Sequence, residues 1–111
     1  MSDLTSRYSG FLGGIAAIYA DDKGLKAQLK ALAITREDWD DGFNGGHLRF
    51  ETPVWADTVL YDTVDAFAHD ADGARIEVIL HFVGGRLNWG EWFRFDGEPI
   101  RHWPPARLWR P

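Results

Sequence analysis

The sequence predicts a single α+β domain in which N-terminal helices pack on one face of an antiparallel β-meander of about four strands. Apolar residues recur at helical spacing over residues 8–34, and strand-like segments separated by turn signals occupy residues 47–97. The length of 111 residues fits one domain with one core, spanning residues 1–111, and residues 98–111 form an aromatic, basic tail.

Two amphipathic helices are predicted in the first third of the chain. Over residues 8–20 apolar side chains recur every three or four positions, although three glycines weaken the pattern. Residues 23–33 repeat the spacing more clearly, with lysines on the other faces. Asp21 or Asp22 fits the N-cap position of this second helix.

Four strand candidates follow a polar stretch at residues 35–46. They are rich in β-branched and aromatic residues, and their ranges are 47–52, 58–68, 74–83 and 86–95. Glycine-containing turn signals precede, separate or follow them, at residues 44–46, 69–73, 84–85 and 96–97. This spacing predicts consecutive antiparallel pairing with the helices on one face.

The Gly84-Gly85 pair matches a two-residue hairpin loop, and such a loop determines the register of the two strands that it joins. Counting from this loop places Val78 opposite Glu91 and Ile76 opposite Phe93. Glu91 then lies on the otherwise apolar face that packs against the helices.

A carboxylate in those surroundings would lose solvation, so we expect the pKa of Glu91 to rise, as is typical of functional sites. The sequence therefore suggests a small-molecule pocket between helices and sheet, lined by Trp89, Glu91, Trp92 and Phe93. Three structural alternatives remain open: a bulge at Gly90 that turns Glu91 outward, an ion pair with a base such as Arg49, and a place at the sheet rim.

An acidic stretch at residues 37–41 surrounds one tryptophan and is the best candidate for partner binding. Asp38, Trp39, Asp40 and Asp41 combine an aromatic anchor with negative charge that suits a basic surface. A solvated loop is an equally good interpretation. The net charge of −5 disfavours binding to nucleic acid or to an anionic membrane.

The tail is basic, because residues 99–111 contain three arginines and no acidic residue. We expect Trp103 and Trp109 to pack back on the sheet. The alternative is an exposed tail that meets the acidic surface of a second copy, which would give a homodimer.

Signals of catalysis, metal binding and membrane insertion are lacking in the sequence. Cysteine is absent, the four histidines do not have metal-ligand spacing, and no nucleophile or phosphate-loop motif occurs. We therefore expect no catalytic residues, no metal and no cofactor. No apolar run approaches the length of a membrane span, and we expect a cytoplasmic protein.

Residues 70–105 resemble a group of small uncharacterised bacterial α+β proteins. The shared pattern is an Asp-Gly turn, an apolar strand, Gly85-Arg86-Leu87, a strand bearing the carboxylate of Glu91, and Asp-Gly-x-Pro at residues 96–99. The resemblance implies a helix pair followed by a β-meander. It implies no activity, so no functional residue follows from it.

Together these features favour a non-enzymatic bacterial interaction protein, with a toxin-neutralising, immunity-type protein that covers a basic partner as one concrete form. Two alternatives stay open: a small-molecule-binding or enzymatic domain with a pocket around Glu91, and a purely structural homodimer.

Overall fold

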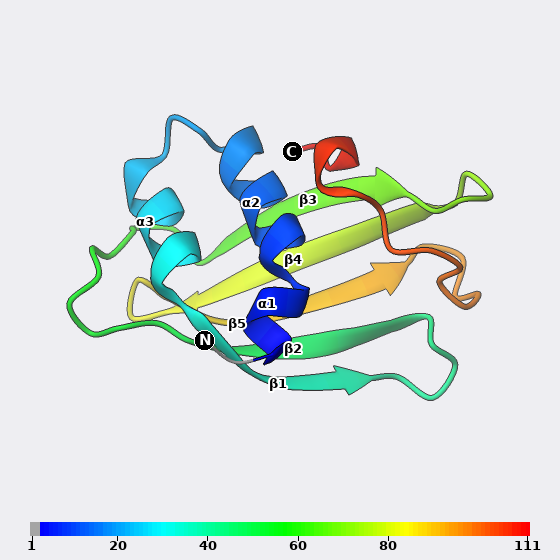
Figure 1. Cartoon of the computed structure of the whole chain (residues 1–111), viewed down its shortest axis with the longest axis horizontal. Helices are drawn as coiled ribbons and strands as arrows, with labels where there is room; N and C mark the ends of the chain where they lie inside the picture. Colours follow the sequence, from blue (N-terminus) through cyan, green and yellow to red (C-terminus); the bar gives the residue numbers. More distant parts are fainter. Residues whose placement is uncertain (1–2) are drawn as a thin grey trace.

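The computed structural model describes residues 3–111 as three helices followed by a five-stranded sheet (Figure 1). The helices are α1 (Asp3–Arg7), α2 (Ser9–Ile18) and α3 (Lys23–Ala31). The strands are β1 (Ala33–Trp39), β2 (Gly45–Glu51), β3 (Thr63–His69), β4 (Arg75–Val83) and β5 (Arg86–Arg94), and a short 3-10 helix, η1 (Ala106–Leu108), follows them. The α+β class is thereby confirmed. No helix within residues 3–111 has the length and apolar character needed to cross a membrane.

The helices cover one face of the sheet, which we call the covered face (Figure 1). The predicted helix at residues 8–20 corresponds to α2, and the short helix α1 precedes it where the sequence predicted none. The predicted cap of α3 is Asp22, whose carboxylate accepts a hydrogen bond from the Leu25 amide at 3.0 Å. The apolar stripes of α2 and α3 contribute Ile15 and Leu29 to the core.

The strand order is β1-β2-β5-β4-β3, and every neighbouring pair is antiparallel. The predicted number of about four strands is thus one short, because β1 occupies residues expected to be a polar stretch. β1 is an edge strand, and its two faces carry mostly polar side chains, so it lacks the alternation that reveals a half-buried strand.

The hairpin between β4 and β5 begins as predicted and then departs from the predicted register. Gly84 and Gly85 have positive φ angles of 60° and 79°, and Phe82 pairs with Leu87. The next pair is His81 with Trp89, so Asn88 is an extra residue that forms a β-bulge. Every later pair is displaced by one position.

This displacement corrects the predicted faces of β5. Glu91 pairs with Ile79, not with Val78, and it lies on the face away from the helices, which we call the open face. The predicted register, which put Glu91 and Phe93 on the covered face, implied the opposite face for Trp92 and Arg94, but both are buried on the covered face. The expected location of Glu91 between helices and sheet is therefore wrong, and the bulge lies at Asn88, two residues before Gly90.

The C-terminal tail packs on the domain, as the favoured interpretation expected. It runs over the covered face beside α2 (Figure 1), where Trp109 is fully buried against Phe11 at a ring-centroid distance of 5.2 Å. Arg110 forms a β-bridge with Phe67 at the outer edge of β3. Close passage of η1 requires Gly14, since a Cβ there would lie 2.7 Å from the Ala106 carbonyl oxygen.

Candidate functional site

The predicted partner-binding residues lie at the end of β1 and in the turn that follows it. We call Asp38, Trp39, Asp40, Asp41 and Phe43 the acidic corner. Trp39 is 37% exposed, and its ring stands edge-on against the buried Trp92 at a centroid distance of 5.0 Å. The ring of Phe43 lies 6.2 Å from that of Trp39 and is 62% exposed. The corner therefore presents two neighbouring aromatic rings to solvent on a rigid support.

Phe43 has a backbone conformation that bulky residues rarely adopt. Its φ angle is 53°, in the left-handed region that favours glycine and asparagine. The surrounding turn holds it there, because its N–H donates to Asp40 and its carbonyl accepts from Ile100, both at 2.9 Å. Strained residues that persist by such restraint are concentrated at functional sites.

The acids of the corner differ in how much of their charge is available. Asp38 forms an ion pair with Arg36 at 2.7 Å on the exposed surface. Asp40 and Asp41 have no ion-pair partner among the side chains of residues 4–111. The free negative charge of the corner is thus concentrated in Asp40 and Asp41, directly between the two exposed rings in sequence.

A cleft of about 400 Å³ opens behind Trp39, lined by Arg7, Tyr8, Glu37, Trp39 and Trp103. Glu37 is 17% exposed and accepts hydrogen bonds from Arg7, at 3.0 Å, and from the Tyr8 hydroxyl. Burial, followed by the hydrogen bond to Glu37, raises the pKa of Tyr8, so its hydroxyl stays a donor at neutral pH. The cleft combines aromatic walls with a partly buried carboxylate.

The residues of the predicted Glu91 pocket do not share one face. Trp89, Glu91 and Phe93 lie on the open face, whereas Trp92 packs in the core. On the open face the His81 ring stacks on Trp89 at 3.8 Å with an interplanar angle of 3°, and its Nε2 lies 2.8 Å from a Glu91 oxygen. A hollow of about 270 Å³ adjoins this group, with Arg49, Asn88 and His47 in its lining.

Sequence reasoning missed the roles of Tyr8, Glu37 and Phe43. Tyr8 and Glu37 are 29 positions apart, and no sequence signal joins them. The sequence could have identified Phe43, since a large apolar residue is unusual in a turn otherwise made of Asp, Gly and Asn. Among the side chains of residues 4–111, His, Asp and Glu nowhere gather in a group of three that could hold a metal ion.

Comparisons with known proteins add nothing to these observations, since no family model, curated protein or solved structure matches the chain.

Proposed function

We propose that this chain is a non-enzymatic binding protein that recognises a basic partner protein through the acidic corner. The observation that carries the proposal is the pair of exposed rings, Trp39 and Phe43, beside the unpaired carboxylates Asp40 and Asp41. Aromatic anchors contribute most of the free energy at binding hot spots, and surrounding charge steers and orients the encounter.

The cleft behind Trp39 gives the partner a place for one cationic side chain. A lysine or arginine entering between Trp39 and Trp103 would meet aromatic faces and approach Glu37. Arg7 already pairs with Glu37, but its side chain is 59% exposed and is free to move aside into solvent. A cleft with aromatic walls and a carboxylate that can exchange Arg7 for a cation of the partner supports recognition of a basic segment.

Neutralisation of a basic toxin, as by an immunity protein, is one concrete version of the proposal. A small acidic protein with a net charge of −5 that covers a basic catalytic surface would block access of substrate to that surface. Bacterial origin, which the sequence resemblance implies, and a cytoplasmic location, which the sequence leads us to expect, belong to this version of the proposal.

A library of random linear peptides displayed on phage tests the proposal without a known partner. We expect selection on the purified chain to enrich peptides rich in lysine and arginine. In titrations of one selected peptide, the Asp40→Lys/Asp41→Lys variant should bind about tenfold more weakly or worse. Asp38→Lys should cost less, because Arg36 already neutralises Asp38.

The matched control is Asp21→Lys/Asp62→Lys, which changes the net charge equally at exposed positions outside the corner. This control should bind the peptide nearly as well as the unmodified chain, and Trp39→Ala/Phe43→Ala should lose binding without any change of charge. Equal weakening by both charge-reversal pairs, or selection of peptides with no basic residues, would refute the proposal.

The open face supports a second candidate, binding of a small planar ligand beside Trp89 and Glu91. The hydrogen bond from His81 to Glu91 and the stack of His81 on Trp89 form a preorganised polar and aromatic surface next to the hollow. Ligand-induced thermal shifts that survive Glu91→Gln unchanged would count against this candidate.

A homodimer, the third candidate, is supported by the edge position of β1, whose outer side carries no strand among residues 3–111. Light scattering at micromolar concentration tests it, and a monomeric mass would refute it. The version in which an exposed aromatic tail forms the interface is excluded, because Trp109 is buried within its own chain.

A further inference from the structure

A groove of about 460 Å³ lies between α2 and the C-terminal half of α3, and none of its lining residues lines the cleft behind Trp39. Residues Leu12, Gly13, Ala16, Leu29, Lys30 and Ala33 are among those that line it. Its floor is apolar, since Leu12 and Leu29 are only 6% and 4% exposed. Its volume falls within the range of small-molecule sites in proteins.

Small residues on both helices keep the groove open. A Cβ added at Gly13 would meet no atom within 4 Å, so glycine at this position leaves space that no neighbouring side chain fills. The two hydroxyl groups at the end of the groove already have partners. The Thr5 oxygen accepts from the Ile34 amide at 2.8 Å, and the Ser9 hydroxyl donates to the Ser6 carbonyl at 2.9 Å.

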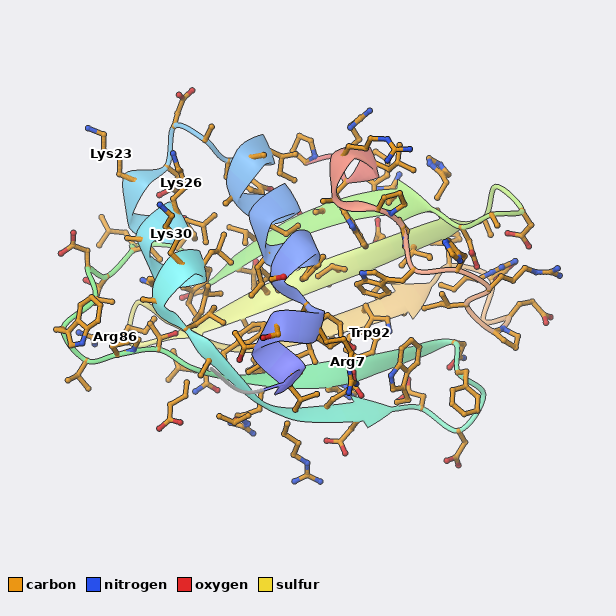
Figure 2. The ribbon with its side chains drawn as sticks, viewed as in Figure 1. Arg7, Lys23, Lys26, Lys30, Arg86 and Trp92 are labelled. Atoms are coloured by element: carbon orange, nitrogen blue, oxygen red, sulfur yellow. The ribbon has the colours of Figure 1, made fainter. Side chains whose placement is uncertain are left out.

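Lys30 is the only charged residue in the lining, and it has no ion-pair partner among the side chains of residues 4–111. Figure 2 shows that Lys23, Lys26 and Lys30 follow one another along α3, with Lys30 nearest the end of the helix that borders the groove. An apolar trough with one free ammonium group at its edge is complementary to a molecule with an aliphatic chain and an anionic head.

We propose that this groove binds a medium-chain amphiphile with a carboxylate head group, with the aliphatic chain along Leu12, Gly13 and Leu29 and the carboxylate at Lys30. Burial of the chain supplies the free energy of binding. The charge of Lys30 selects the sign of the head group. This site shares no lining residue with the cleft or with the acidic corner, so it is independent of the proposed partner binding.

Isothermal titration of the full chain with decanoate, below its micelle concentration, tests the proposal. We expect saturable binding of one equivalent. Gly13→Leu should weaken binding by about tenfold or more, because the new side chain occupies the trough, and leucine is a better helix former than glycine. Gly10→Leu is the matched control on the same helix, since its Cβ also meets open space but Gly10 does not line the groove.

Changing the charge on the protein, and then on the ligand, tests the role of the anionic head group. Lys30→Gln should weaken decanoate binding about three- to fivefold, as expected for an exposed ion pair, whereas Lys26→Gln should leave it unchanged. Decyltrimethylammonium, which has the same chain and the opposite charge, should bind much more weakly. The proposal is overturned if decanoate does not bind, if Gly13→Leu binds as the unmodified chain does, or if the two amphiphiles bind equally.

Discussion

Replacement of Gln28 by methionine tests how a helix side chain maintains the register of the β4–β5 hairpin. Gln28 is fully buried on α3, and its Oε1 accepts from the amide of Leu87 at 2.8 Å, next to the bulge at Asn88. Its Nε2 donates to the carbonyls of Asp57, at 2.7 Å, and Gly85, at 2.9 Å. Methionine keeps the length of the side chain and removes all three hydrogen bonds.

The expected loss in the free energy of unfolding depends on whether each hydrogen-bonding partner of Gln28 finds a replacement. The buried Leu87 amide loses the side-chain oxygen to which it donates, and a stranded donor of this kind costs about 1–3 kcal/mol. The Asp57 carbonyl belongs to an exposed residue and can turn to water, so its loss costs about 0.5–1.5 kcal/mol. The Gly85 carbonyl keeps its hydrogen bond from Val59. The free energy of unfolding should fall by about 2–4 kcal/mol.

Urea unfolding at pH 7 measures this loss, and amide hydrogen exchange locates it. The Leu87 amide should be protected in the unmodified chain and exchange faster in Gln28→Met, whereas amides in the middle of β4 should exchange through global unfolding. Lys26→Met on the exposed side of α3 is the control and should change stability by less than about 0.5 kcal/mol. A loss below about 1 kcal/mol with unchanged exchange at Leu87 would refute this account.

Two further predictions concern the covered face and its rim. Arg94 forms ion pairs with three aspartates: Asp70 at 2.9 Å, Asp72 at 2.6 Å and Asp96 at 2.8 Å. Hydrogen bonds from Arg94 lower the pKa of Asp72 and bring that of Asp96 to about 2. Burial would raise the pKa of Asp70, but hydrogen bonds from backbone amides and Arg94 outweigh it and lower the pKa. Because the pKa of each of these aspartates lies below the ordinary 3.8, the stabilisation that they give in the ionised form is complete at neutral pH and is lost as the pH falls from about 4 toward 2. Urea midpoints should therefore drop only in that window. Midpoints that stay constant to pH 2 would contradict this reasoning. Trp109→Ala should lower the free energy of unfolding by about 3–5 kcal/mol in thermal melts, and a loss below about 1 kcal/mol would show that the tail is not part of the core.

Local signals in the sequence predicted the elements whose two faces differ clearly. The lysines and leucines of α3, and the run of alternating apolar residues in β4, have a single consistent interpretation. The turn at Gly84-Gly85 was also predictable, because two successive positive φ angles are easy only for glycine. These features determined the fold class and the first two pairs of the hairpin correctly.

The face of β5 could not be predicted, because both of its faces carry aromatic residues. Trp89 and Phe93 occupy one face and Trp92 the other, so alternation alone does not identify the core side. The polarity of the charged residues in β5 did not identify the core side either, since Arg94 is buried and Glu91 is half-exposed. The charge of Arg94 can be buried because aspartates on the flanking loops surround it. These aspartates approach Arg94 only in the folded chain, so the sequence does not reveal the arrangement.

The sequence predicted which residues form the acidic corner, but it did not predict which other residues lie beside them in the folded chain. The acids and Trp39 are contiguous in sequence, which made them candidates, whereas Tyr8 and Trp103 approach them only in the folded chain. The difference in availability between Asp38 and its neighbours depends on Arg36, whose ion pair two residues away follows from the strand geometry of β1.

The contact between Phe11 and Trp109 has a consequence for the speed of folding. The two rings pack at a centroid distance of 5.2 Å although 98 positions separate them in the sequence. The α2 side of the core can therefore close only when the chain between them forms a long loop, which costs conformational entropy before the contact forms. Contacts this distant in sequence raise the contact order and slow folding.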